Sequence, residues 1–130
     1  MRKVFILFLI QLTLFASHFR DGIRYYKQKK YKEAFKEFRA SANKEKSKSS
    51  YYFLGVLYLK GLGTPQDLKK AEKYLKYALS FGNARANCFL AEIFLIKKKE
   101  IKKAKKMLLD GKKSGAYECE EIAKNYKIDL

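Results

Sequence analysis

The sequence predicts an all-α protein in which helix–turn–helix repeats stack one after another as an α-solenoid. The main observation is a recurring order of small and large apolar residues, with equivalent small residues 33, 36 and 32 positions apart. Apolar residues follow the helical period nearly throughout, and the alternation typical of strands is missing. Pro65, the single proline, falls in an expected turn. We therefore expect about three and a half helix pairs, just enough to bury a continuous core.

Residues 1–16 have the character of a secretory signal peptide. Arg2 and Lys3 give a basic start, residues 4–15 are mostly apolar, and Ala16 and Ser17 are small residues where a peptidase could cut. The apolar run is shorter than the roughly 18–20 residues that a membrane span requires. An uncleaved anchor and a buried first helix are the alternatives. We expect a mature repeat domain, residues 17–130, that is periplasmic or secreted and keeps no stable membrane span after cleavage.

The first repeat unit begins the recurring pattern. Gly22 and Tyr25 form the spacing G-x2-Y, and Ala34 and Phe38 follow with the spacing A-x3-F. The sequence KQKK at residues 27–30 is a short connection without glycine. This unit is therefore predicted to be two helices joined by a tight turn.

The second unit, residues 52–86, is the most complete. Its defining residues are Leu54, Gly55, Tyr58, Gly61, Gly63, Ala71, Ala78 and Gly82. Gly55 should let its two helices approach closely. The connection at residues 61–67 supplies glycines for a left-handed helix end, and it offers Asp67 as the N-cap of the next helix.

The third unit and a final half-unit complete the chain. Ala91 and Phe94 occupy the small and large positions of the first helix, and Ala104 occupies the small position of the second. The connection at residues 97–100 is KKKE. A last segment at residues 122–126 repeats the first-helix pattern and is expected to close the stack.

The second unit resembles a Sel1-like repeat, a tetratricopeptide-like family. The resemblance rests on its glycine-containing turn together with Lys70, Ala71, Tyr74, Ala78 and Gly82. It covers about one repeat closely and residues 19–128 in outline, and the first unit is closer to a plain tetratricopeptide repeat. The resemblance implies a right-handed solenoid whose first helices line a concave face. It also implies binding of a protein or peptide partner, with no cofactor.

Residues at equivalent positions of the repeats can be placed on this concave face, which gives a candidate binding face. The residues placed on it are Tyr26, Tyr52, Leu59, Lys60, Cys88, Glu92, Leu95, Tyr117, Glu120 and Lys124. Tyrosine and leucine could supply the desolvated centre of an interface, and the charged residues an orienting rim. A solvated or terminal-cap face is the alternative for any one of them.

Two cysteines, Cys88 and Cys119, fall in the first helices of consecutive units. An oxidising compartment would permit a bridge between them, and free cysteines packed in the core are the alternative. The resemblance adds that cysteine-rich secreted Sel1-like proteins usually carry bridges inside each repeat, a pattern that this chain lacks. Two cysteines and His18, the lone histidine, are too few ligands for a zinc site.

The net charge of +17 suits anionic partners, through a salt-dependent attraction. Most of the lysines, however, fall on the polar sides of predicted helices. The chain also uses lysine far more than arginine, whereas readers of nucleic-acid sequence rely on arginine forks. We therefore expect no specific nucleic-acid partner, and we keep an anionic polymer or lipid surface as an alternative.

An enzymatic alternative rests on short motifs. Residues 41–44, SANK, fit S-x-x-K, and residues 113–115, KSG, approximate K-T-G, but the S-D-N element is missing. Chance matches are expected in a chain so rich in lysine. Some secreted Sel1-like proteins are catalogued as β-lactamases, so an enzyme acting on cell-wall or β-lactam substrates remains an alternative function. The main expectation is a binding scaffold without catalytic residues.

Overall fold

The computed structural model is entirely helical, which confirms the predicted all-α class. It describes the backbone of residues 1–130 and the side chains of residues 1–10, 18–44 and 46–130. The helices are α1 (Arg2–Lys27), α2 (Tyr31–Glu45), α3 (Lys48–Lys60), α4 (Leu68–Ser80), α5 (Arg85–Ile96), α6 (Ile101–Lys113) and α7 (Glu118–Asn125).

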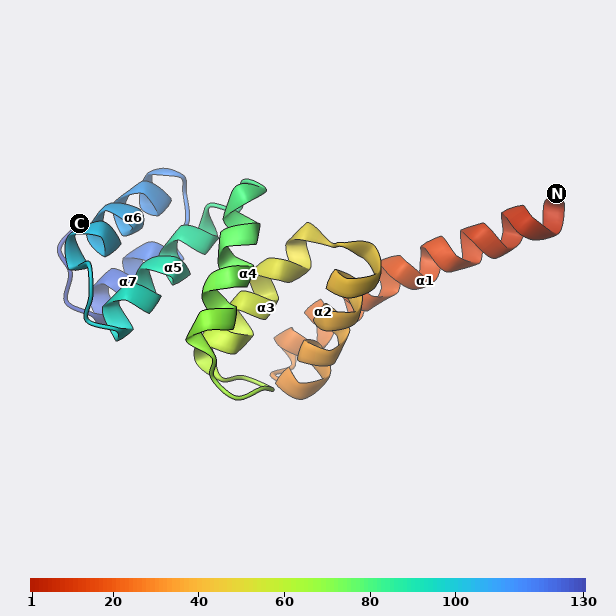
Figure 1. Cartoon of the computed structure of the whole chain (residues 1–130), viewed down its shortest axis with the longest axis horizontal. Coiled ribbons are helices and arrows are strands. Elements are labelled where there is room, and N and C mark those ends of the chain that lie inside the picture. Colours follow the sequence, from red (N-terminus) through yellow and green to blue (C-terminus); the bar gives the residue numbers. More distant parts are fainter.

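The helices pack as consecutive pairs. Helix α1 packs most closely on α2, α3 on α4, and α5 on α6, while α7 packs on both α5 and α6. Neighbouring pairs meet through α2 and α3, through α4 and α5, and through the first helices α3 and α5. The chain therefore runs as a row of repeat-like pairs, with its two termini at opposite ends of the long axis (Figure 1).

Two glycines lie where a helix approaches its partner most closely. A Cβ atom on Gly22 would lie 2.7 Å from Cε1 of Phe38, and one on Gly55 would lie 2.6 Å from Cγ of Leu75. The same Gly55 Cβ would be 3.2 Å from the backbone nitrogen of Leu75. The small residue that recurs in each first helix therefore leaves room for the large residue of the second.

The turn of the second unit has the predicted chemistry. Gly61 ends α3 in the left-handed conformation with φ of 65°, and the Asp67 carboxylate accepts a hydrogen bond of 2.9 Å from the backbone N–H of Lys70. A Cβ atom on Gly63 would lie 2.2 Å from the carbonyl oxygen of Tyr31. The long turn thus packs against the start of α2, where a side chain at Gly63 would not fit.

The turns of the outer units lack glycine, as their sequences indicate. Lys29 between α1 and α2 has φ of 57°, while Lys98 and Glu100 between α5 and α6 have φ of 51° and 49°. These residues adopt the left-handed region without the freedom of glycine, at a cost of roughly 1–2 kcal/mol each. The outer turns are therefore short but strained.

Helix α1 has two parts with different surroundings. Residues 1–10 are exposed, and this part of the helix extends away from the rest of the chain (Figure 1). From Phe19 onward, α1 packs on the other helices, with the Phe19 ring 6.0 Å from that of Phe38. The predicted cleavage site at residues 16–17 lies outside the described side chains. Among the described residues, no helix has the length and apolarity needed to cross a membrane.

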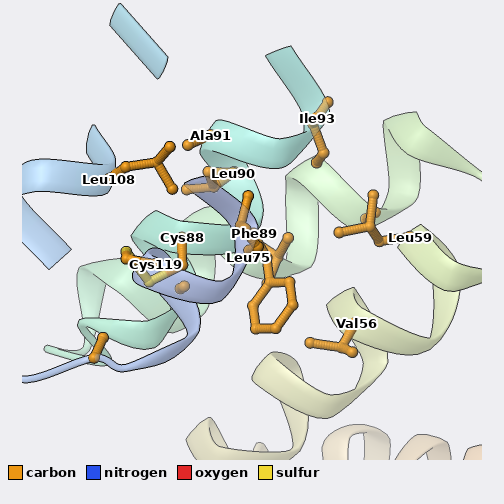
Figure 2. Close-up of a cluster of buried hydrophobic side chains, with 14 of the residues drawn as sticks. Val56, Leu59, Leu75, Cys88, Phe89, Leu90, Ala91, Ile93, Leu108 and Cys119 are labelled. Atoms are coloured by element: carbon orange, nitrogen blue, oxygen red, sulfur yellow. A yellow bond between two sulfur atoms is a disulfide. The ribbon is translucent and has the colours of Figure 1, made fainter. Parts of the chain in front are cut away.

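Two hydrophobic clusters share helix α3. The first joins α1, α2 and α3 around Phe38, whose ring stacks on Phe53 with centroids 4.6 Å apart. The second runs from α3 to α7 and includes Leu75, Phe89 and the disulfide-bonded Cys88 (Figure 2). The core is thus continuous along the row of helix pairs, and it sets the positions of the first helices.

Candidate functional site

A cavity of about 420 Å³ lies among the first helices of the repeat units. Its lining residues are Tyr26, Val56, Lys60, Leu62, Phe89, Glu118, Glu121, Ile122 and Asn125. They come from α1, α3, the turn after α3, α5 and α7, and none comes from α2, α4 or α6. We call this cavity the groove. Its volume falls within the roughly 300–1,000 Å³ typical of ligand sites.

One wall of the groove holds a buried carboxylate. Glu118, the first residue of α7, has a side chain only 7% exposed. The Nε–H of Arg85 donates a hydrogen bond to its Oε1 atom, whereas Oε2 has no hydrogen-bond partner among the described residues. A buried polar atom without a partner costs about 1–3 kcal/mol. Glu118 therefore keeps a desolvated carboxylate oxygen without a hydrogen-bond partner in the wall of the groove.

Arg85 is itself held between aromatic rings. Its guanidinium lies 4.7 Å from the ring centroid of Tyr52 and 5.9 Å from that of Tyr117. These cation–π contacts and the bond to Glu118 fix the guanidinium from three sides. Arg85 thus connects the start of α5 with α3 and α7.

The opposite wall carries a second ion pair. Lys60 on α3 donates a hydrogen bond of 2.6 Å to Oε1 of Glu92 on α5, and the Tyr126 hydroxyl lies 3.5 Å from the same oxygen. Burial and the Glu92 charge raise the pKa of Tyr126. The Oε2 atom of Glu92 has no hydrogen-bond partner in the described part of the chain. The pair fixes the Lys60 ammonium at the groove.

Some of the expected binding residues do line the groove. Tyr26 and Lys60 are on its surface, and Glu92 contributes indirectly by holding Lys60. Tyr117 is 68% exposed and reaches Arg85. Glu120 and Lys124, in contrast, line a separate hollow near the C-terminus. The repeat pattern of the sequence correctly predicted that first helices line the groove. It did not predict which side of α7 faces the groove.

Three expected groove residues, Tyr52, Leu59 and Leu95, are buried in the core. The expectation that they form an accessible surface is wrong. Helices α3 and α5 pack against each other, and α5 also packs against α7, so side chains that would face a groove on an isolated pair are covered. Cys88 is likewise fully buried.

The groove also contains residues that sequence reasoning missed. They are Val56, Leu62, Phe89, Glu118, Glu121, Ile122 and Asn125, with Arg85 behind the wall. The sequence could have indicated some of these residues, because positions four apart share one face of a helix. Val56 lies four residues before Lys60, and Glu118 lies four residues before Ile122. The same spacing relates Glu121 to Asn125.

The two cysteines form a disulfide between α5 and α7, with Cα atoms 4.7 Å apart (Figure 2). Both are fully buried. A Cβ atom on Gly111 would lie 2.4 Å from Sγ of Cys119 and 3.1 Å from Sγ of Cys88, so α6 contacts the bridge at a glycine. The disulfide holds Cys119 against α5, and therefore also its neighbour Glu118 at the groove.

The motifs of the enzymatic alternative do not form an accessible site. Ser41 is fully buried within α2, which continues to Glu45. Ser114 donates a hydrogen bond to the carbonyl oxygen of Asp110.

His18 pairs with Glu37 across α1 and α2 at 2.6 Å. Among the described side chains, no cluster of potential ligands could hold a metal ion.

Alkaline pH should destabilise the fold through the buried Tyr52 and the half-buried Tyr26. Burial raises the pKa of Tyr52 and of Tyr26 above the ordinary value of 10.0, although the Arg85 charge acts in the opposite direction. A raised pKa favours the neutral phenol in the folded state, so this stabilisation is complete below pH 10.0 and is lost as pH rises further. Urea unfolding between about pH 8 and 11 measures the loss. Tyr52→Phe should lose less stability over this range, and an equal loss would contradict the assignment.

Comparisons with known proteins assign no family and no function to this chain. No protein-family model matches the chain, and no curated protein matches it. Its function is therefore inferred from the residues that line the groove and from the helices that hold them.

Proposed function

We propose that this chain is a Sel1-like repeat protein that holds a segment of a protein partner in the groove between α1, α3, α5 and α7. The observation that carries the proposal is the composition of the groove. Apolar side chains of Val56, Phe89 and Ile122 lie beside charged Lys60 and Glu118. A concave surface with apolar contacts and a few fixed polar groups suits an extended or helical segment. No covalent step is involved.

The proposal includes a right-handed α-solenoid of about three and a half repeats. It is supported by the consecutive helix pairs and by the close approach at Gly22 and Gly55. In such a stack each repeat contacts only its neighbours, so a partner collects contributions from several units. The lining of the groove by four first helices fits this arrangement.

We further propose that the protein is exported and that its mature form starts near Ser17. The apolar residues of the protruding end, from Val4 to Ile10, are exposed, which would be unfavourable in a mature protein in water. The described contacts of α1 with α2 and α3 lie beyond this point, from His18 onward. The disulfide is compatible with an oxidising compartment. Removal of residues 1–16 would therefore keep the described contacts of α1 with α2 and α3, which lie beyond residue 17.

Photo-crosslinking tests the groove directly. A photoreactive phenylalanine analogue at Asn125, which is exposed and lines the groove, should yield a discrete product with the partner in the native cell envelope. The product should persist at about 0.5 M salt, because apolar contacts are not screened. The same analogue at Lys73, exposed on α4 away from the groove, should give no such product. Equal crosslinking at both positions would contradict the proposal.

A second candidate function is binding of an anionic polymer, and one surface cluster favours it. Tyr77 and Phe81 at the end of α4 are 46% and 50% exposed, and both rings lie near that of Tyr51. The Lys48 ammonium lies 4.5 Å from the ring centroid of Phe81. Exposed aromatic rings beside a cation suit stacking on a charged chain. In that case, binding would fall steeply with salt and would not depend on Asn125.

A further inference from the structure

We propose that the groove selects a partner segment by binding one of its lysine or arginine side chains at Glu118 and Glu121. This inference rests on the proposed function and adds the chemistry of the partner. It begins with the Glu118 carboxylate, which lines the groove with a side chain only 7% exposed. Arg85 occupies Oε1, and Oε2 has no partner among the described residues. An entering N–H group would supply the missing hydrogen bond.

The charge of the groove differs in sign from that of the chain. Lys60 and Arg85 are already paired, with Glu92 and Glu118 respectively. Glu121 also lines the groove, and no ion pair of this residue occurs within the described part of the chain. Two cations against three carboxylates leave one negative charge in a protein whose net charge is +17. A cationic group is the complement of this site.

The lining of the groove suits a long basic side chain. Val56, Phe89 and Ile122 give an apolar path to the carboxylates. Lysine and arginine place aliphatic stems on apolar surface while their charged ends seek acceptors. A bare metal ion is a poor alternative, since the described residues include no cluster of three potential ligands. The alternative is that an ordered water molecule binds Oε2 of Glu118. An experiment must distinguish this water from a basic side chain of the partner.

A peptide series tests the preference. The probes are acetylated, amidated pentapeptides with the sequence Ala-Leu-X-Leu-Ala, in which X is lysine, arginine, norleucine or glutamate. We expect the lysine and arginine peptides to bind the disulfide-intact protein about tenfold more tightly than the norleucine peptide, because a charge-assisted bond forms only with the former. Titration calorimetry and fluorescence anisotropy give the dissociation constants.

Three variants locate the effect. Glu121→Gln removes an exposed charge and should fold normally, and Glu118→Gln removes the buried one. Each should reduce the preference for lysine over norleucine to about threefold or less. Glu120→Gln is the matched control, because it removes the same charge from α7 outside the groove, where Glu120 pairs with Lys112 at 3.1 Å. It should keep the tenfold preference.

The outcomes separate this inference from the proposed function. Equal binding of lysine and norleucine peptides would mean that water satisfies Glu118, which overturns the basic-residue preference but leaves the groove as a binding site. If the photo-crosslink at Asn125 formed equally well in the Glu121→Gln variant, the basic-residue preference would likewise be overturned and the groove would remain a binding site. Self-association that Glu121→Gln abolishes, without peptide binding, would assign the groove to a second copy of the chain and overturn the proposal.

Discussion

Replacing Tyr52 by alanine should lower the free energy of unfolding by about 3–5 kcal/mol, the range for removing a large aromatic side chain from a core. Tyr52 is only 4% exposed. Its ring lies 5.1 Å from that of Phe53 and 5.9 Å from that of Phe89, and the Arg85 guanidinium covers it at 4.7 Å. The substitution would leave a cavity between α3 and α5. Urea unfolding followed by circular dichroism measures the change.

Tyr117→Ala is the matched control for this prediction. Tyr117 also contacts Arg85, but it is 68% exposed, so its removal should change stability by no more than about 0.5 kcal/mol. Tyr52→Phe keeps the ring and should cost less than the alanine substitution. If Tyr52→Ala were as stable as Tyr117→Ala, Tyr52 would not belong to the core, and its assignment to an open surface would be restored.

The core position of Tyr52 changes how the groove can be tested. An alanine substitution there would weaken partner binding by disturbing the fold, so it could not report on direct contact. Glu121 and Asn125 are exposed and line the groove, so substitutions at these positions leave the core intact. They are the residues by which binding should be judged.

Removing the disulfide should lower the free energy of unfolding by about 3–4 kcal/mol, because the bridge closes a long loop in the unfolded chain. Cys88 and Cys119 are separated by 31 positions. The double variant Cys88→Ala, Cys119→Ala should show this loss, and the C-terminal helix α7 should detach first, since in the described part of the chain it packs mainly on α5 and α6. Glu118 would then leave the groove wall.

Unfolding with and without reductant measures this effect, and the double variant serves as the control because reductant should not affect it. The intact mass of the native protein, taken with and without thiol alkylation, reports both the bridge and the loss of residues 1–16. Two free thiols in exported protein would contradict the disulfide. A full-length chain recovered from the cytosol would contradict export.

Much of the helical framework could be predicted from single residues. Gly55 marks a close approach, Gly61 ends a helix and Asp67 begins the next one, and each of these roles depends on local backbone geometry. The apolar period of each helix is equally local, because it follows from 3.6 residues per turn. The all-α class was therefore accessible without knowing how the pairs pack.

The candidate site was only partly predictable. The register placed Tyr26 and Lys60 on the first helices, and both line the groove. It also placed Tyr52 and Leu59 there, and both are buried. A helical pattern shows which residues share a side, but the covering of Tyr52 by Arg85 and Phe89 depends on how α5 packs against α3.

The sequence by itself determined the helices, their turns and the small residues at which they meet, because these follow from interactions between residues close in the chain. Only the tertiary structure decided which polar groups share the groove. Glu118 meets Arg85 from 33 positions away, and Lys60 meets Glu92 from 32 positions away. Such pairs depend on the rotation and spacing of whole helices, which are set by the packing of every side chain between them.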